Sequence, residues 1–430
     1  MKKTILILLC VASVFLIPLS ATGQAEKQGS KPSELKLLVP QSPGVVEGVQ
    51  AVADVYAKLH PEVTITLRSV PFNRYKEQLQ VMWASNDVDD IITTGSPDIP
   101  NYAYYGALLP IDDIIPDAER SQFINGAIEA VTYQGKIYAY PFREAASALF
   151  YNKDYFDMAG VQAAPLDKPW TWEQWEQNIT KVMQVAKQKT GKTVWGITFL
   201  SNPGRGDFWL TPIIRSNGVK GSPTYQAISD DGMTLKGYAD TPEALEAYRF
   251  YQNLYTKKLA PNAEIPDAFG TGQSATFQGF LSSAHDLAKN FPALNWGIMP
   301  LPYFKTPIIH TGGFTYAISA KTKNAAVAKD FVKFAGSDEG IKAYFDVSGT
   351  DLISRADFAK RYPEYFNDPY QKIFTYLLDT YGEARPNTPA YVLYNSIIGF
   401  NLFLDLASGA DVSQTVKAKI NEFETQARSM

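Results

Sequence analysis

The stretch "YAYPFREAASALFYNKDYFDMAG", from Tyr138 to Gly160, decides how the rest of this chain is interpreted. It follows a turn-like "YQGK" and continues as an aromatic-rich apolar strand. Arg143 and Glu144 stand early in that strand, and Tyr-Asn-Lys-Asp closes it. What lies at each end of the strand is therefore the first question that the sequence raises.

The first residues have the pattern of a secretory signal peptide. Two lysines precede the apolar run of residues 4–19, and small and polar residues follow. We expect residues 1–25 to be removed and the mature chain to be exported and soluble, in the periplasm or on the outer side of the inner membrane. Cys10 lies inside the apolar run after Leu9, where a lipid-attachment motif requires a small residue, so we expect no lipid anchor.

Composition restricts the classes of partner. The only cysteine lies in the predicted signal peptide, so the mature chain must rely on core burial rather than on disulfides. With 430 residues in all, two domains are feasible. The formal net charge of -4 argues against nucleic acid, because phosphate binding needs a basic face.

Strand and helix patterns alternate along the chain. Apolar residues recur at helical spacing in two early segments, and buried or alternating runs flank them. The predicted order is strand 35–39, helix 45–59, strand 63–67, helix 75–83 and strand 88–93. Such alternation implies parallel pairing through crossovers and hence an α/β layer. Further along, Thr171 and Gln174 form a capping box at the start of a long helix.

No pattern indicates catalysis. The three histidines, His60, His285 and His310, are far apart and lack carboxylates at ligand spacing, so we expect no metal site. No Gly-x-Ser-x-Gly elbow is present. Adjacent acids such as Asp89-Asp90 point apart, whereas glycosidases draw their two carboxylates from separate elements. We predict no catalytic residue, no metal and no cofactor.

Aromatic residues indicate binding instead. Trp209 lies in "RGDFWLTPIIRSNG", between a glycine loop and an apolar helix, and we expect it to contact a ligand. Flat rings beside polar groups suit sugars, whose C–H faces stack while their hydroxyls take hydrogen bonds. For Tyr104 and Tyr105 the ligand and core roles remain open. Trp172 and Trp175, at i and i+3 of a helix, are expected in the core.

The opening stretch then resembles a known family. "GKIYAYPF" and "LFYNKDYF", with "MAG" and a following Trp-Thr-Trp helix, are similar to extracellular solute-binding proteins of bacterial ABC importers, in particular the carbohydrate-binding family that includes maltose-binding protein. "DVDDIITTG", "YAYYGALLPIDD", "NWGIMPLP", "HTGGFTYAISAKTKNAAVAKDFVKFAGSDEG" and "ARPNTPAYVLYNSI" continue the resemblance in the expected order. It covers nearly the whole mature chain.

The resemblance implies an α/β fold of two lobes, the type II periplasmic-binding-protein fold, with lobes that are discontinuous in sequence. It places residues 26–142 and 310–346 in an N-terminal lobe and residues 143–309 and 347–430 in a C-terminal lobe. The strand after "YP" is then the first crossing between lobes, so its early residues face the cleft and its end packs in the second lobe. Further crossings are expected near 303–312 and 345–352.

The resemblance and the strand ends together give a predicted ligand site. Loops at the carboxyl ends of parallel strands bind ligands in open α/β sheets. We predict contacts from Ser42, Gly44, Thr94, Ser96, Asp98, Arg143, Glu144, Asp207, Phe208, Trp209, Phe280, Gly312, Gly313, Tyr391 and Tyr394. Gly312 and Gly313 are expected to let the backbone approach the ligand. Either Tyr391 or Tyr394 could supply a stacking ring.

Three functions remain open at this point. The first is a monomeric, non-enzymatic carrier that captures a carbohydrate, an oligosaccharide rather than a single sugar, and presents it to a membrane permease. The second is the same carrier for an anion such as glycerol 3-phosphate or an acidic sugar, held by Arg143, Arg205 and Arg385. The third is a secreted glycoside-active enzyme that uses Asp98 and Glu144 as its two carboxylates.

Overall fold

A computed structural model describes residues 33–199, 206–349 and 351–430. The signal peptide predicted for residues 1–25 lies outside the described residues, and so does Arg205.

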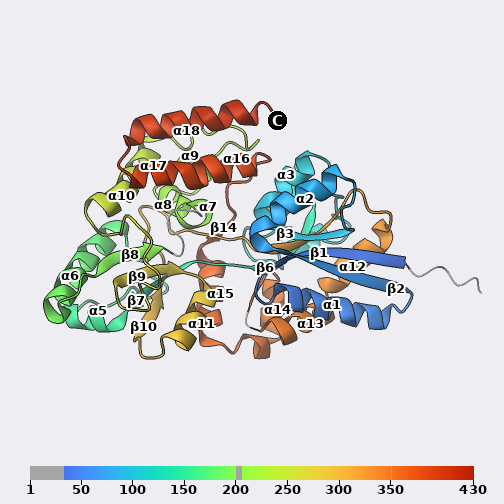
Figure 1. Cartoon of the computed structure of the whole chain (residues 1–430), viewed down its shortest axis with the longest axis horizontal. Coiled ribbons are helices and arrows are strands. Elements are labelled where there is room, and N and C mark those ends of the chain that lie inside the picture. The colour runs from blue at the N-terminus through green and yellow to red at the C-terminus, as the bar shows by residue number, and fades with distance from the viewer. Residues whose placement is uncertain (1–32, 200–205, 350) are drawn as a thin grey trace, which may run out of the picture.

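Two main sheets lie in two halves of the molecule (Figure 1). The first sheet has the order β13 (Leu352–Ile353), β6 (Ala139–Glu144), β12 (Phe314–Ile318), β3 (Ile91–Gly95), β1 (Ser33–Gln41) and β2 (Val63–Pro71). The second has the order β10 (Trp296–Met299), β7 (Ala148–Asn152), β9 (Ser274–Gly279) and β8 (Trp195–Phe199). Two short ribbons join β11 (Ile309–His310) to β14 (Gly382–Glu383) and β4 (Thr132–Tyr133) to β5 (Lys136–Ile137).

Strand direction brings the functional ends of the first sheet to one edge. β1 pairs in parallel with both β2 and β3, which confirms the parallel α/β layer predicted from the alternating pattern. β12 is antiparallel to both β3 and β6, so β6 runs in the same direction as β3. The carboxyl ends of β1, β2, β3 and β6 therefore share one edge. From that edge β6 leads, through residues 145–147, into β7 of the second sheet.

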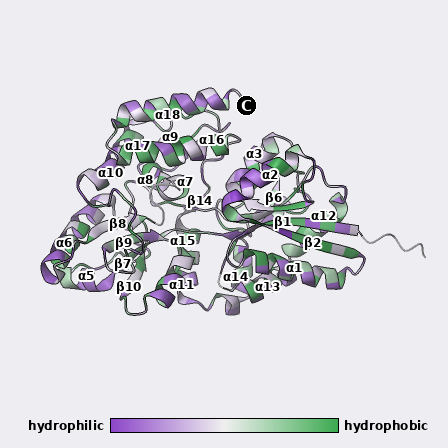
Figure 2. Cartoon of the chain, in the orientation of Figure 1, coloured by the Kyte–Doolittle hydropathy of each residue, from purple (hydrophilic) through white to green (hydrophobic). Residues whose placement is uncertain are grey.

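Helices cover both sheets, and their apolar residues face inward while polar residues face out (Figure 2). Around the first sheet lie α1 (Val45–Leu59), α2 (Tyr75–Ala84), α3 (Ile99–Tyr104), α4 (Asp117–Arg120), α12 (Ala325–Ala335), α13 (Asp338–Ser348) and α14 (Ala356–Arg361). The remaining helices belong to the second half: α5 (Lys153–Ala159), α6 (Trp172–Thr190), α7 (Gly206–Trp209), α8 (Thr211–Arg215), α9 (Pro223–Gln226), α10 (Pro242–Thr256), α11 (Leu281–Asn290), α15 (Pro369–Tyr381), α16 (Tyr391–Ser396), α17 (Phe403–Ala407) and α18 (Val412–Ala427).

Local signals in the sequence set several helix ends as predicted. The Thr171 hydroxyl accepts from the Gln174 amide, and the Gln174 side chain accepts from the Thr171 amide, so the capping box is confirmed. α6 ends at Gly191, which has the left-handed φ of 70° that favours glycine. Trp172 and Trp175 are buried in the core, as expected for their spacing on this helix.

The third passage between the halves differs from the prediction. We expected the chain to cross near 345–352 and the second lobe to begin at 347, but β13 still pairs with β6 in the first sheet. The chain then forms α14 and a short 3₁₀ helix (Pro363–Phe366) before α15 packs against α11, with Phe374 beside Phe150 of β7. The passage therefore comes between the 3₁₀ helix and α15.

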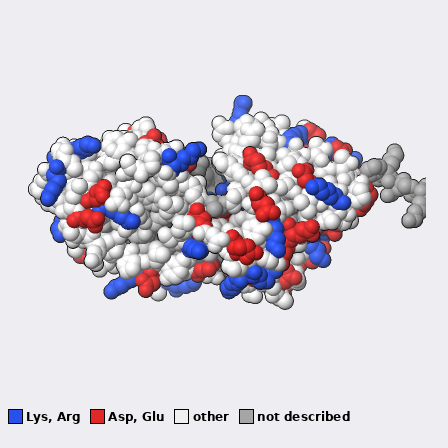
Figure 3. All heavy atoms as spheres, turned by 90° about the horizontal axis from the view of Figure 1, so that it is seen from below, with Lys and Arg blue, Asp and Glu red and all other residues white. Residues whose placement is uncertain are grey.

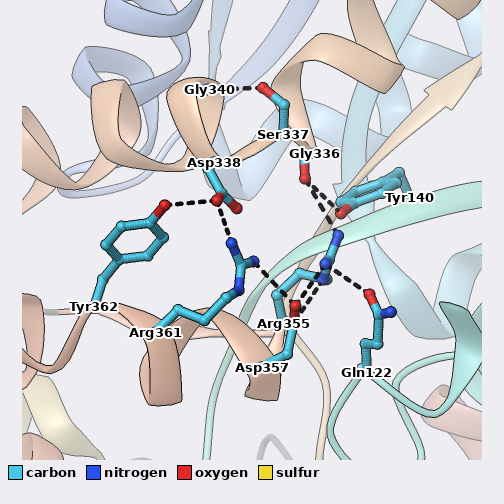
Figure 4. Close-up of polar contacts among 10 residues, drawn as sticks. All are labelled: Gln122, Tyr140, Gly336, Ser337, Asp338, Gly340, Arg355, Asp357, Arg361 and Tyr362. Carbon is cyan, nitrogen blue, oxygen red and sulfur yellow. Dashed lines mark hydrogen bonds and ion pairs between the residues drawn. The ribbon is translucent and has the colours of Figure 1, made fainter.

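A network of ion pairs holds this later segment against the first sheet (Figure 4). Arg355 forms a bidentate pair with Asp357, at 2.7 Å for both bonds, and donates to Gln122. Arg361 in turn pairs with Asp357 and with Asp338 at the start of α13. Because these partners come from three separate segments, no local sequence pattern reveals that residues 352–361 stay with the first sheet.

Candidate ligand site between the two sheets

The first half contributes a row of buried polar residues at the carboxyl edge of its sheet. Thr94 is the second-to-last residue of β3, and Ser96 and Asp98 follow in a 3₁₀ turn (Ser96–Asp98); all three are at most 3% exposed. Ser42 and Gly44 follow β1 and are half-buried. The structure thus brings together the five residues predicted from the first half, since their strands end at one edge.

Lys76 is a residue of this edge that sequence reasoning missed. Its Nζ lies 2.6 Å from Asp98 Oδ1 and also 5.2 Å from the ring centroid of Tyr391, which belongs to the second half. Lys76 is on α2, and nothing in its local sequence distinguishes it from other surface lysines. The pairing also means that the Asp98 carboxylate already has a cationic partner.

Asp207, Arg385 and Tyr391 form the polar centre of the second half. Asp207 Oδ2 accepts from Arg385 Nη1 at 2.8 Å and from the Tyr391 hydroxyl at 2.6 Å. Arg385 Nη1 also lies 3.0 Å from the Tyr391 hydroxyl. Burial works against the charged guanidinium, but Tyr391 and Asp207 together hold the pKa of Arg385 above its ordinary value. The arrangement is a buried, charge-balanced cluster.

Aromatic rings surround this polar centre. The guanidinium carbon of Arg385 lies 4.7 Å from the Phe208 ring centroid. Phe208 packs against Phe280 with centroids 5.3 Å apart, and Trp209 packs against Phe280 at 4.2 Å. Trp209 is only 1% exposed, in α7 rather than in a loop, whereas Phe280 is half-buried. The burial of the indole favours a packing role for Trp209, and its contact with a ligand stays a prediction.

The charged pair of the opening stretch lies where β6 leaves the first sheet. Arg143 Nε donates to Asp351 Oδ1 at 2.6 Å, in a second ion pair that sequence reasoning did not find. Glu144 is 3% exposed, and its Oε1 accepts from the Ser354 hydroxyl at 3.2 Å. Burial raises the pKa of Glu144 to about 7, although Ser354, the Gly312 backbone and Arg385 partly oppose the shift.

His310 of β11 lies on the second crossing and is hydrogen-bonded to the backbone of the polar centre. Its Nε2 lies 2.8 Å from Arg215 Nη1, so this nitrogen accepts, and Nδ1–H donates to the Asp207 carbonyl at 2.5 Å. Burial, Arg215 and Arg385 lower the pKa of His310 well below its ordinary value, which keeps the ring neutral. With both nitrogens engaged, the ring orients Asp207 and has no free atom for acid–base chemistry.

The two predicted glycines make close backbone approaches within the protein. A methyl group at Gly313 would lie 1.7 Å from the Arg143 carbonyl oxygen, so this glycine lets β12 lie against β6. Gly312 has a φ of 149°, and a methyl group there would lie 2.7 Å from Arg385 Nη2. These contacts account for both glycines without a ligand, and a ligand contact at either stays a prediction.

The two predicted tyrosines separate in the structure. Tyr391 takes part in the polar centre and lies beside Lys76 of the opposite half. Tyr394 is 1% exposed and packs edge-on against Phe423 of α18, with centroids 6.1 Å apart. Of the pair, Tyr391 is the one that lies at the junction.

The two halves touch directly at this junction. The Asn101 side chain donates to the Pro389 carbonyl at 2.5 Å, and the Asn387 side chain donates to the carbonyls of Glu129 and Thr132 at 3.0 Å. Together with Lys76 over Tyr391, these contacts join α3 and its neighbours to the segment that leads into α16. From below, the molecule narrows between its halves, and acidic and basic side chains are interspersed on both (Figure 3).

Comparison with known proteins identifies the family of this chain. The model described as "Bacterial extracellular solute-binding protein" matches residues 41–342, more than half of the chain. The chain belongs to this family. Among the described residues of this solute-binding protein, no group of three or more metal-ligating side chains is gathered, and no helix has the length and apolarity to span a bilayer.

Individual relatives are similar at low identity. The arabinooligosaccharide-binding protein of Bacillus subtilis is 24% identical over 420 residues, covering 90% of both chains. The maltotriose-binding protein of Pyrococcus abyssi is 25% identical over 348 residues, covering 76% of this chain and 67% of the relative. The cyclic alpha-maltosyl-1,6-maltose binding protein of Arthrobacter globiformis has a similar crystal structure, with a TM-score of 0.76 and 19% identity over 93% of this chain and all of that one. The fold is thus the two-lobe type II periplasmic-binding-protein fold expected from the sequence.

The raised pKa of Glu144 predicts a pH-dependent stability. The folded chain holds this proton between about pH 4.5 and 7, where the unfolded chain has lost it, so the free energy of unfolding should fall as pH rises through that window. Glu144→Gln removes the effect, and wild type should lose up to about 3 kcal/mol relative to the variant between these limits. Urea unfolding at several pH values measures the difference, with the exposed Glu62→Gln as control. Parallel pH profiles for wild type and Glu144→Gln would contradict it.

Burial also predicts how Trp209 and Phe280 differ. Trp209→Ala empties a buried site and should cost about 3–5 kcal/mol of stability, whereas Phe280→Ala removes a half-exposed ring and should cost clearly less. Thermal and urea melts of the two variants provide the test. A Trp209→Ala variant that melts like the wild type would instead support the exposed ligand-stacking role expected from the sequence.

Proposed function

We propose that this chain is an extracytoplasmic carrier that captures a neutral carbohydrate of oligosaccharide size between its two lobes and delivers it to the permease of an ABC importer. We define the lobes as the two sheets with their helices, with the third passage placed after residue 366. The observation that carries the proposal is a set of buried polar atoms without partners at the crossings, next to the half-buried ring of Phe280.

Four of the thirteen buried side-chain atoms without a partner among the described residues lie at or next to the passages between the sheets. Glu144 Oε2, Ser147 Oγ and Thr311 Oγ1 are buried and have no hydrogen-bond partner within the protein. Trp209 Nε1, in the neighbouring aromatic cluster, is also buried without a hydrogen-bond partner. A buried polar group left unpaired costs about 1–3 kcal/mol, so a concentration of such groups calls for an explanation. A polyhydroxylated ligand supplies donors and acceptors of the kind they lack.

The aromatic cluster supplies the second requirement of a sugar site. Phe280 is half-buried, is held by Phe208 and Trp209, and lies at the end of β9 beside the crossing. A ring held in this way offers a flat apolar surface for the C–H face of a sugar. Polar groups and a stacking ring at one junction are the combination typical of carbohydrate sites.

Charge favours a neutral ligand over an anion. Three cations at the junction already have an acidic partner: Lys76 pairs with Asp98, Arg143 with Asp351 and Arg385 with Asp207. The buried Arg215 has its guanidinium engaged by the Tyr225 and Ala384 carbonyls and by His310. An anionic ligand would have to displace a buried carboxylate or remain without a guanidinium fork of its own. The names of the relatives, which bind arabinooligosaccharides and maltotriose, support the carbohydrate class.

Carriage rather than hydrolysis also fits the state of Asp98, one of the two carboxylates considered for an enzyme. Asp98 is already engaged by Lys76 at 2.6 Å, and the named relatives are binding proteins. We propose a monomer without cofactor, metal or nucleic-acid partner, exported through a cleavable signal peptide at residues 1–25. Ligand contacts from both lobes would stabilise the closed form in a two-state hinge.

A thermal-shift panel tests the ligand class. The panel holds three neutral trisaccharides, arabinotriose, maltotriose and raffinose, and two anions, glycerol 3-phosphate and galacturonate. At least one trisaccharide should raise the melting temperature of the protein, and neither anion should. Chromatography of the incubated sugar should return it intact. A shift by an anion alone would favour the anion carrier, and a cleaved sugar would show an enzyme.

A further inference from the structure

Phe72 is an exposed ring at the edge of the first sheet that carries the proposed site. It follows directly after β2, whose carboxyl end lies beside those of β1 and β3, and it begins the 3₁₀ turn Phe72–Arg74. The side chain is 51% exposed, although a phenylalanine gains from burial. The proposed function assigns no role to this ring.

The Phe72 ring packs against a residue next to the crossing strand. It meets Phe314 edge to face, with centroids 6.3 Å apart and an interplanar angle of 87°. Phe314 begins β12 and pairs with Gly95 on one side and Arg143 on the other. The Arg143 guanidinium carbon lies 5.8 Å from the Phe314 centroid. Phe72 is therefore coupled to the crossing strand through one intervening ring.

Polar side chains stand beside the exposed ring. Gln41 is paired in register with Pro71, the residue before Phe72, and its amide donates to the Ser69 hydroxyl at 3.4 Å. Both polar side chains are exposed at the same edge. An accessible ring at the same sheet edge as an exposed amide and hydroxyl has the chemistry of a sugar subsite.

We propose that Phe72 is a second stacking platform, on the first lobe, for a sugar ring of an oligosaccharide whose other end lies against Phe280. The inference rests on the proposed function and adds the extent of the ligand to it. Arg143 pairs with Phe314 and Ala148 pairs with Gly279, so at most about 18 Å of chain, five residue steps, separates the two strand positions beside which the platforms lie. The proposal therefore assigns the two platforms to different sugar rings of one oligosaccharide.

Calorimetric titration of the Phe72→Ala variant tests the second platform. The trisaccharides arabinotriose, maltotriose and raffinose are titrated, and the monosaccharides arabinose, glucose and galactose are titrated separately for comparison. The trisaccharide that binds wild type should bind the variant at least tenfold more weakly, while the affinity of a monosaccharide that binds changes by less than twofold. Phe72→Trp, which keeps a flat face, should restore the affinity. Leu59→Ala is the matched control, because Leu59 is 52% exposed at the end of α1, which returns to the opposite edge of the sheet.

The outcomes separate the subsite from the carrier function. If Phe72→Ala binds the trisaccharide as tightly as wild type and Leu59→Ala, the subsite is wrong and the carrier function stands. If wild type binds no sugar of the panel, the carrier function fails and the subsite fails with it. A melting curve for each variant, unchanged within a few degrees, assigns any loss of affinity to the ring.

Discussion

The closeness of Gly313 to the Arg143 carbonyl fixes two chain crossings side by side where they leave the first sheet. A side chain at Gly313 would overlap that carbonyl, so β12 could not lie against β6 in its present register. Because the register is held, Arg143 reaches Asp351 and Glu144 reaches Ser354, the two residues that flank β13 of the first sheet. The start of the first crossing is thus tied both to β12 and to the residues that flank β13.

Most charged side chains at this junction are paired with one another. Lys76, Arg143 and Arg385 each have a carboxylate within 2.8 Å. The buried Arg215 instead donates to the carbonyls of Tyr225 and Ala384 and to His310, which stays neutral. The charged groups of the site are therefore already engaged within the protein, and its dipoles and rings are left for a ligand. A neutral polyhydroxylated ligand can enter such a site without separating an ion pair, which an anion could not do as easily.

The sequence predicted the parts of this structure that depend on local signals. Parallel pairing of β1 with β2, the capping box at Thr171 and the core positions of Trp172 and Trp175 all follow from periodicity, and the structure has them. It did not predict the partners of Lys76 or Arg143, because those pairs join residues far apart in the chain. It placed the third passage too early because β13 has only two residues, too few for a strand pattern.

X-ray scattering with and without sugar tests most directly the central claim, that the chain closes around a neutral oligosaccharide. With the trisaccharide that gives the largest thermal shift present at saturation, the radius of gyration should fall, because contacts from both lobes bring them together. Galacturonate at the same concentration should leave the curve unchanged. A scattering curve that is the same with and without the saturating trisaccharide would contradict the account.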